Sequence, residues 1–269
     1  MISKDAFRKT IRDYYEESRR EFPWRETTDP YKIWISEVML QQTQTSRVLP
    51  KYLSFIKKFP DFKSLTEASL PDLLQQWSGL GYNRRALYLQ QSAQKLIKEF
   101  QGILPTDPKE LETFPGIGKA TARSILVFSK NIPLVFIETN IRRVYIHLFF
   151  TNQENVSDAE IEKVLEQTLD KQNPREFYYA LMDYGAMLAK IEQINPNRKS
   201  KHYSKQSNFE TSVRKIRGEI LRQLLAKKSL SKKALENILN NDSRFEAALL
   251  GLQKDNLITL TKTIIQIKK

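Results

Sequence analysis

The sequence predicts an all-α protein, and three observations support that fold class. Apolar residues recur three and four positions apart, as at Leu73, Leu74, Trp77 and Leu80, which is the spacing of one buried helix face. Glycine is scarce, with 8 in 269 residues. Seven of the 11 prolines are predicted to mark short connections between helices: Pro50, Pro60, Pro71, Pro105, Pro108, Pro115 and Pro133. We therefore expect helices nearly throughout the chain.

The order of these segments predicts three parts. Residues 1–194 are periodic and apolar enough for a large helical domain, apart from a run at 132–137 that reads as a short strand or a buried connector. Residues 195–210 are polar and basic, which indicates a linker or a loop that faces DNA. Residues 211–269 then predict helices at 214–225, 232–240 and 244–252 and a hairpin at 258–267. That order is typical of a small winged-helix module.

Composition restricts the partners and cofactors. Lys and Arg number 44 against 31 Asp and Glu, so the net charge of +13 favours a polyanion, although many basic proteins bind no nucleic acid. The absence of cysteine excludes disulfides, thiolate zinc sites and cysteine-ligated iron–sulfur clusters. The chain has two histidines, His147 and His202, too few for a histidine-based metal site, so we expect none. With neither a signal peptide nor a long apolar run, we expect a cytoplasmic, nucleoid-associated protein without membrane contact.

A glycine-containing turn between two helices is the sharpest motif. It reads Phe114-Pro-Gly-Ile-Gly-Lys-Ala-Thr-Ala122. Glycines allow positive φ and a close approach of the backbone to a ligand, and the N–H groups that open the next helix can hold a phosphate. An ordinary helix–helix turn is the alternative. We favour a DNA phosphate site.

Two carboxylates stand in patterns that suggest acid–base chemistry. Glu37 lies inside the apolar run 33–40, where desolvation would raise the pKa of its carboxyl and let it act as a general acid. A glutamate on the wet side of an amphipathic helix would look the same. Glu138 follows an apolar run and heads a predicted helix, so it is either a favourable cap or a carboxylate that faces a developing positive charge.

Residues 19–189 resemble the helix-hairpin-helix (HhH-GPD) base-excision DNA glycosylases, and most closely the MutY-type adenine glycosylases. The matching text is PWR, PY-IW-SEVMLQQTQ, W-GLGY, FPGIGKATA, ETN-RRV and ALMD-GAM, in this order. The resemblance implies a two-lobed helical fold with DNA between the lobes. It also implies hydrolysis of an N-glycosidic bond after the target base has been flipped out of the duplex.

The resemblance assigns catalytic and base-binding roles. Glu37 matches the acid that protonates the leaving adenine, and Glu138 stands where the family has an Asp that stabilises the cationic sugar. Asn140 matches the Asn beside that Asp. Arg25 and Asp183 match residues that line the adenine pocket. These roles fit the chemistry, which needs a protonated leaving base and an anion near the sugar.

It also assigns DNA contacts. Gln42 and Tyr82 match side chains that wedge into the base stack opposite the flipped nucleotide. In the family hairpin, backbone atoms hold a phosphate, often through a monovalent cation, which here implies Na+ or K+ at the backbone of Phe114 and Gly116. The DNA-binding residues of the hairpin are then Gly116, Gly118, Lys119 and Thr121.

The chain departs from the family in four places. A four-cysteine iron–sulfur loop would begin at Ala189, and in its place we expect Arg198, Lys199 and Lys201 to contact DNA. Glu138 replaces Asp, which displaces the carboxylate. Ala120 stands where bifunctional relatives place a catalytic Lys, so it excludes a Schiff base there. Residues after 207 are too few and too helical for the Nudix-like domain that reads 8-oxoguanine.

These inferences predict a monomeric, monofunctional glycosylase for adenine opposite 8-oxoguanine or guanine in double-stranded DNA. A uracil or mismatched-thymine glycosylase on the same scaffold is the alternative among enzymes. A non-catalytic DNA-binding protein is the alternative from another class, because the altered Glu138 weakens the catalytic assignment.

Overall fold

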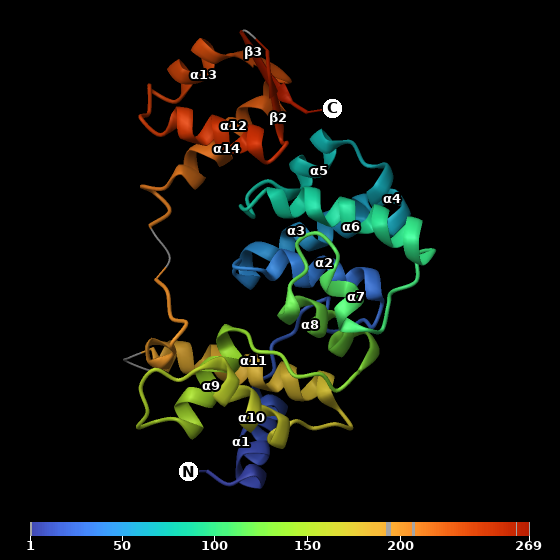
Figure 1. Cartoon of the computed structure of the whole chain (residues 1–269), viewed down its shortest axis with the longest axis vertical. Helices are drawn as coiled ribbons and strands as arrows, with labels where there is room; N and C mark the ends of the chain where they lie inside the picture. Colours follow the sequence, from blue (N-terminus) through green and yellow to red (C-terminus); the bar gives the residue numbers. More distant parts are fainter. Residues whose placement is uncertain (1, 192–194, 206–207, 262, 269) are drawn as a thin grey trace. The chain divides into compact units, whose positions relative to one another are not determined.

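The computed structural model describes residues 2–191, 195–205, 208–261 and 263–268, and α-helices dominate these ranges, as predicted. The chain forms two compact units. Unit 1 comprises Met1–Ile33, Thr106–Glu112 and Ile117–Lys205, and unit 2 comprises Trp34–Pro105, Thr113–Gly116 and Gln206–Lys269. Figure 1 traces the chain through its helices. The predicted division at residues 194 and 210 stays a prediction.

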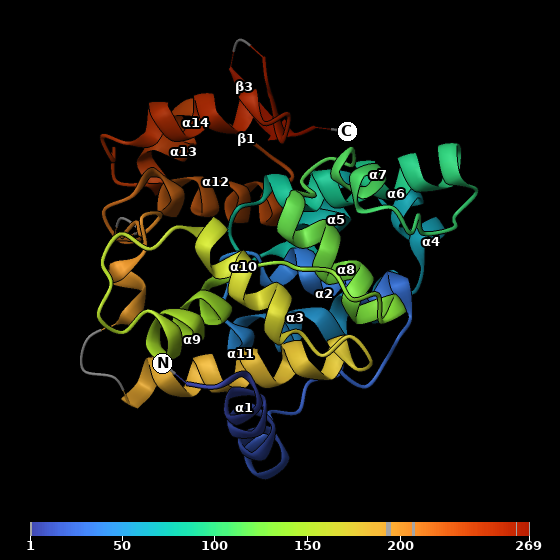
Figure 2. The same ribbon diagram turned by 60° about the horizontal axis from the view of Figure 1, so that its bottom comes forward.

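Unit 1 is a bundle built around two adjacent helices, α9 and α11. Its elements are α1 (Lys4–Ser18), α7 (Pro108–Glu112), α8 (Lys119–Lys130), α9 (Thr139–Phe149), α10 (Asp158–Thr168), α11 (Pro174–Ile191) and the 3-10 turn η1 (Pro196–Lys199). Helix α1 buries Phe7, Ile11 and Tyr15, which are four residues apart and therefore lie on one face. These side chains join the core formed by α9, α10 and α11. Both Figure 1 and Figure 2 show α9 alongside α11.

Residues Trp34–Pro105 of unit 2 form a second helical core. Its helices are α2 (Pro30–Leu40), whose first turn belongs to unit 1, α3 (Thr45–Lys58), α4 (Phe62–Glu67), α5 (Leu70–Trp77) and α6 (Arg84–Phe100). Trp34, Phe55 and Trp77 are fully buried and supply much of the apolar volume. The periodic run 73–80 that predicted a helix is α5 and the turn that follows it. Pro50, predicted to mark a connection, instead lies in the second turn of α3, so that prediction was wrong.

The C-terminal part of unit 2 contains the helices predicted there. They are α12 (Val213–Lys227), α13 (Lys232–Ile238) and α14 (Phe245–Lys254), followed by the hairpin β2 (Ile258–Leu260) and β3 (Ile264–Ile267). A further strand, β1 (Ser229–Ser231), completes an antiparallel sheet in the order β1-β3-β2. Figure 2 shows α12 packed along α14. We refer to residues 208–268 as the C-terminal module; its winged-helix assignment stays a prediction.

Two segments that the sequence left open are resolved by their contacts. Residues 132–137 form a connector, and the Phe136 amide donates to the Tyr178 hydroxyl at 3.2 Å. In residues 195–205, η1 packs on α9, and the side-chain amide of Asn197 donates to the Thr139 carbonyl at 3.0 Å. A backbone bridge also joins Ser200 to Val156. Gln206 and Ser207, which end the predicted linker, lie outside the described residues.

Candidate active site

The structure brings together the two residues predicted to line the base pocket. Arg25 donates from both terminal nitrogens to the Asp183 carboxylate, at 2.8 Å in each case. Asp183 lies on α11, whereas Arg25 is the last residue of the PWR motif near the start of the chain. The Arg25 guanidinium also lies 4.6 Å from the centroid of the Tyr179 ring. This bidentate geometry fixes the orientation of both side chains.

A third residue completes the pair. Arg20, which sequence reasoning missed, donates from its backbone N–H to Asp183 at 2.9 Å and from Nε at 2.6 Å. Burial by itself raises the pKa of Asp183, but the hydrogen bonds and charges of Arg25 and Arg20 outweigh it, so the net shift is downward. Asp183 is therefore a carboxylate held ionised by two guanidinium groups.

Glu138 is the N-cap of α9. Its carboxylate accepts hydrogen bonds from the backbone N–H groups of Asn140, at 2.8 Å, and Ile141, at 3.0 Å. Burial raises the pKa of Glu138, and the two N–H donors and the charge of Arg143 counteract that shift only in part. The capping role inferred from sequence is thus present. The second role, opposite a cationic sugar, stays a prediction.

Asn140 is fixed by the groups around it. Its side-chain oxygen accepts from Arg143 at 2.8 Å, and the same Arg143 nitrogen donates to the Gly185 carbonyl at 2.7 Å. Gly185, the glycine of the ALMD-GAM motif on α11, has no room for a side chain, because a Cβ there would lie 2.4 Å from the Asn140 carbonyl oxygen. Arg143, whose buried guanidinium links α9 to α11, was quoted in the motif but not recognised as a site residue.

Glu37 occupies the predicted place in an apolar helix. On α2, residues Ile33–Ser36 and Val38–Met39 are buried and Glu37 itself is half-buried. It belongs to unit 2, whereas the other predicted catalytic residues, Glu138 and Asn140, belong to unit 1. The predicted role of Glu37 as general acid stays a prediction.

The two predicted wedge residues share an uncommon backbone conformation. Gln42 has φ 53° and Tyr82 has φ 47°, both in the left-handed region that non-glycine residues rarely adopt. Both side chains are exposed. Residues in this conformation persist when the surrounding structure holds them there, and they occur often at functional sites.

One buried arginine holds both wedge loops. Nη1 of Arg85 donates to the carbonyls of Val38 (2.7 Å) and Gln41 (2.7 Å), which precede Gln42. Its Nη2 donates to the Gly81 carbonyl (3.1 Å), immediately before Tyr82. Burial lowers the pKa of Arg85 to about 10, so the side chain remains charged at neutral pH. Sequence reasoning missed this residue, although it stands three positions after Tyr82.

The hairpin turn requires glycine at position 116. Gly116 has φ 76°, and a Cβ there would lie 3.0 Å from the Tyr88 ring. Its carbonyl accepts from the Gln41 amide at 3.2 Å. A carbonyl oxygen has a second lone pair, so this bond leaves room for the expected Na+ or K+ at the backbone of Phe114 and Gly116. The ion itself stays a prediction.

The helix after the turn begins without a side-chain cap. Gly118 is the N-cap of α8 with φ −97°, and nothing lies within 4 Å of the position that a Cβ would occupy. Its conformation is therefore open to other residues, unlike that of Gly116. Lys119 pairs with Glu162 at 3.0 Å, and Ala120 packs against the core of unit 1. The phosphate contacts predicted for Gly118, Lys119 and Thr121 stay predictions.

The basic segment expected to replace the iron–sulfur loop lies on the surface of unit 1. Arg198 and Lys201 are exposed, whereas Lys199 donates to the Thr151 carbonyl and lies 3.8 Å from Glu154. Their predicted contacts with DNA remain untested. Among the described residues, no group of three or more His, Asp or Glu side chains is arranged to hold a metal ion. The described helices include none with the length and apolar character needed to cross a membrane.

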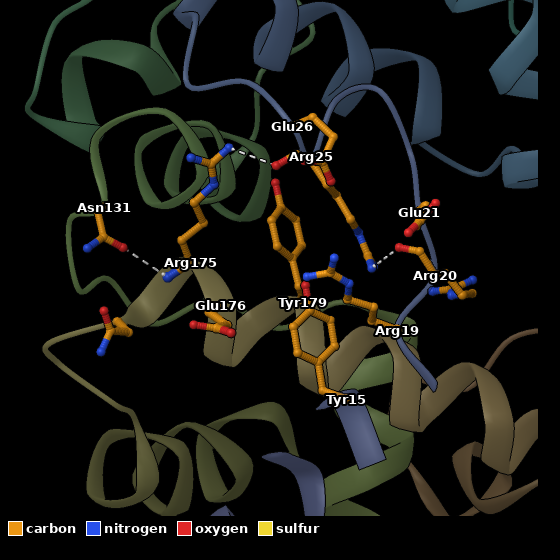
Figure 3. A pocket seen from close by; sticks show the side chains of 11 residues that line it. Tyr15, Arg19, Arg20, Glu21, Arg25, Glu26, Asn131, Arg175, Glu176 and Tyr179 are labelled. Atoms are coloured by element: carbon orange, nitrogen blue, oxygen red, sulfur yellow. Dashed lines mark hydrogen bonds between the residues drawn. The ribbon is translucent and has the colours of Figure 1, made fainter. Parts of the chain in front are cut away.

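A pocket of about 440 Å³ opens in unit 1 on one side of Arg25 (Figure 3). Figure 3 shows Tyr179 between Arg25 and Arg175 on its wall. The other lining residues are Tyr15, Arg19, Arg20, Glu21, Glu26, Asn131, Asn173 and Glu176. The charges on this wall nearly balance, and Arg25 is the one predicted site residue among those that line it. We therefore do not identify this pocket with the predicted base site.

Comparison with known proteins identifies the family. The model of the HhH-GPD superfamily of base excision DNA repair proteins matches residues 35–171, and the chain belongs to this superfamily. A protein named adenine DNA glycosylase from Buchnera aphidicola (subsp. Baizongia pistaciae) is 40% identical over 188 residues, 68% of this chain and 53% of that protein. The mouse protein of the same name is 32% identical over 193 residues, 67% of this chain and 38% of that protein. The chain thus spans about half the length of the Buchnera protein and less than half the length of the mouse protein.

Solved structures agree on the fold. A thermostable thymine-DNA glycosylase aligns with a TM-score of 0.64 and 25% identity, covering 74% of this chain and 93% of its own. Endonuclease III in a trapped covalent complex with DNA aligns at 0.62 with 21% identity, over 72% of this chain and 91% of its own. The second likeness concerns the fold alone. Together with the family match, these alignments confirm the predicted glycosylase fold.

Proposed function

We propose that the chain is a monofunctional DNA glycosylase of base excision repair that releases adenine mispaired with 8-oxoguanine or guanine. The observation that best supports this proposal is the similarity to adenine DNA glycosylases, which extends over 188 residues at 40% identity. The buried Arg25–Asp183 pair is compatible with it, as is Glu138, which caps α9 and lies beside Asn140. Its partner is double-stranded DNA, which the protein binds as a monomer at the nucleoid.

In the proposed mechanism the two carboxylates have opposite protonation states. Glu37 donates a proton to the leaving base as its bond to the sugar breaks, and ionised Glu138 stabilises the positive charge that develops on the sugar. A water molecule then adds to the sugar carbon and gives up a proton, which completes the hydrolysis. The two N–H groups that Glu138 accepts from favour its ionised form. Base flipping costs a few kcal/mol, which insertion of Gln42 and Tyr82 into the stack offsets. Ala120 offers no amine, so we expect an intact abasic strand without a lyase step.

One specific observation supports the alternative substrate. The thymine-DNA glycosylase covers 74% of the chain at 25% identity, so a thymine or uracil opposite guanine is the second candidate. This alternative shares the fold and the predicted DNA contacts with the first. Only the excised base separates the two.

A base-release assay distinguishes these functions. Duplexes carry A, T, U or hypoxanthine opposite G or 8-oxoguanine, and alkali converts each abasic product into a strand break. We expect cleavage of the strands that carry A, and only after treatment with alkali. Release of T or U alone would support the alternative. Tight binding without release of any base would identify a non-catalytic DNA-binding protein.

Matched variants test the role of Glu37. Glu37→Gln should abolish release while DNA affinity remains within about twofold, because the acid acts on the reacting base and not on the backbone. Glu67→Gln removes the same charge from an exposed position in the same unit and should keep wild-type activity. Release by Glu37→Gln at the wild-type rate would eliminate the proposed acid.

A further inference from the structure

An arginine of the C-terminal module contacts the predicted wedge residue Tyr82. Nη1 of Arg214 donates to the Tyr82 hydroxyl at 2.8 Å, and the guanidinium lies 5.7 Å from the centroid of the Tyr82 ring. Arg214 stands in the first turn of α12. It lies outside residues 35–171, which the family model matches. Neither the sequence motifs nor the family therefore assigns it a role.

A second contact holds the module beside the same loop. Asp255, at the end of α14, accepts from Arg84 at 3.2 Å and from Arg217 on α12. Arg84 is two residues from Tyr82, so this contact and the one from Arg214 meet the chain on either side of Asn83. Gly251 leaves the space that Arg217 occupies, since a Cβ there would lie 2.6 Å from its Nη1. The module therefore meets the Tyr82 loop through an ion pair as well as through Arg214.

Positive charge gathers around this loop. Arg84 is 53% exposed, and Arg47 is exposed and donates to the Gly79 carbonyl. Tyr82 itself keeps 38% of its surface exposed in a left-handed conformation. An exposed aromatic ring among guanidinium groups is the combination that nucleic acids bind, through stacking and charge.

We propose that Arg214 contacts DNA beside Tyr82, on the strand that carries the base opposite the flipped nucleotide. This inference rests on the proposed function, in which Tyr82 inserts into that stack. A guanidinium has five N–H donors, so its bond to the Tyr82 hydroxyl does not prevent it from binding DNA. The atoms it would bind are oxygens of that strand, either a phosphate or the O6 edge of a guanine.

Disulfide cross-linking tests this placement directly, because the chain contains no cysteine. Arg214→Cys supplies the single thiol, and a duplex carries a thiol tether on the strand opposite the target adenine. Arg222→Cys is the matched control, since Arg222 lies on the same helix and is 64% exposed. We expect cross-linking from position 214 at the opposing base or the adjacent phosphate, about tenfold above that from position 222. Equal yields from the two positions would overturn the proposal.

Affinity measurements identify the atom and do not depend on a tether. Arg214→Gln should weaken binding to a duplex with A opposite G about tenfold, whereas Arg222→Gln changes it less than twofold. An equal loss on a duplex that lacks the opposing base indicates a phosphate, and a loss confined to guanine or 8-oxoguanine indicates the base edge. Unchanged or tighter binding by Arg214→Gln, with a melting temperature like that of the wild type, would overturn the proposal.

Excision by the wild-type protein separates this inference from the proposed function. Adenine release without a position-specific cross-link at 214 would refute the contact alone. A cross-link at 214 with no release of any base would refute the proposed function and leave the DNA contact of the module established.

Discussion

Asp183 accepts a hydrogen bond from each terminal nitrogen of Arg25, and both side chains are nearly inaccessible, at 1% and 6% exposure. Arg20 shares the same carboxylate at 2.6 Å. One negative charge is therefore surrounded by two positive charges inside unit 1. Removal of that charge would leave the Arg25 guanidinium buried without compensation, which is far costlier than loss of a surface pair.

Asp183→Asn should therefore destabilise the protein by about 3 kcal/mol or more, as measured by urea unfolding. Asp13→Asn is the matched control, because it breaks the exposed Lys9–Asp13 pair on α1 and should cost less than about 0.5 kcal/mol. Similar losses in the two variants would show that the buried pair contributes no more than a surface pair.

The same carboxylate predicts an acid-dependent loss of stability. The pKa of Asp183 is lower in the folded protein than in the unfolded chain, so its contribution is present above the unfolded value. It is lost as pH falls through the folded value. In urea unfolding from neutral pH down to about pH 3, the difference in unfolding free energy between wild type and Asp183→Asn should shrink. A difference that is independent of pH would contradict this assignment.

The two hairpin glycines predict opposite outcomes. Gly116→Ala should cost about 1–2 kcal/mol or more, because alanine at positive φ is strained and its Cβ would press on the Tyr88 ring at 3.0 Å. Gly118→Ala should be nearly neutral or slightly stabilising, since its φ is ordinary and the space is open. Thermal unfolding of the two variants measures this contrast.

DNA affinity then separates structure from binding at the second glycine. If the backbone at Gly118 approaches a phosphate, Gly118→Val should weaken binding to any duplex sequence while the fold remains stable. If Gly118→Val binds DNA as tightly as the wild type across a range of salt concentrations, no phosphate approaches the backbone there.

This hairpin illustrates how far sequence reasoning extends. The motif predicted the helix–turn–helix arrangement correctly, because proline, glycine and apolar spacing are local signals. It could not distinguish Gly116 from Gly118, since the Tyr88 ring that makes glycine necessary comes from a distant helix. Likewise Glu138 as a helix cap follows from its immediate neighbours and was anticipated.

Contacts between distant segments account for most of what the sequence did not reveal. Arg20 is 163 residues from Asp183, and Arg85 is 44 residues from Gln41, so no motif spacing joins them. Strand β1 (Ser229–Ser231) has one leucine between two serines, a pattern too short to predict a strand. It is a strand because it pairs with β3. The polar composition of residues 195–210 predicted a linker or a DNA-facing loop, but it gave no sign that Asn197 would be buried and hydrogen-bonded to the Thr139 carbonyl of α9.

The buried Arg85 should contribute strongly to the stability of unit 2. Arg85→Met leaves the buried carbonyl of Val38 and the partly buried carbonyls of Gln41 and Gly81 without this donor, so we expect a loss of about 3 kcal/mol in urea unfolding. Arg12→Met, at a 68% exposed side chain on α1, is the control and should change stability by less than about 0.5 kcal/mol.

Arg85→Lys tests whether this residue positions the wedge loops. Lysine keeps the charge but lacks the planar fork that reaches both loops. We expect it to fold, to bind undamaged duplex normally, and to give a smaller rise in 2-aminopurine fluorescence when that base is the flipped target. A normal fluorescence rise would mean that Arg85 has a structural role only.

Glu138 allows capping and catalysis to be separated within one side chain. Glu138→Ala removes the acceptor for the N–H groups of Asn140 and Ile141 and should cost about 1 kcal/mol. Glu138→Asp retains a preferred N-cap residue and should leave stability within about 1 kcal/mol of wild type. Glu138→Gln keeps an oxygen that can accept the same bonds but carries no charge.

Single-turnover base release by the same variants then tests the charge. If Glu138 stabilises the sugar cation, Glu138→Gln should release adenine about 100-fold more slowly or worse, although its helix remains capped. Glu138→Asp should equal or exceed wild type, since an aspartate at the N-cap reaches the same N–H groups. Wild-type release by Glu138→Gln would reduce Glu138 to a cap.

The pH dependence of stability checks the electrostatic part of this argument. Burial raises the pKa of Glu138 in the folded protein, so the folded state binds more protons than the unfolded chain between the unfolded and folded values. Wild-type stability should therefore fall as pH rises through that interval, a trend opposite to the one expected for Asp183. Glu138→Gln has no proton to lose and should not show this decline. If both proteins lose stability equally over this interval in urea unfolding, Glu138 is not the group that titrates there.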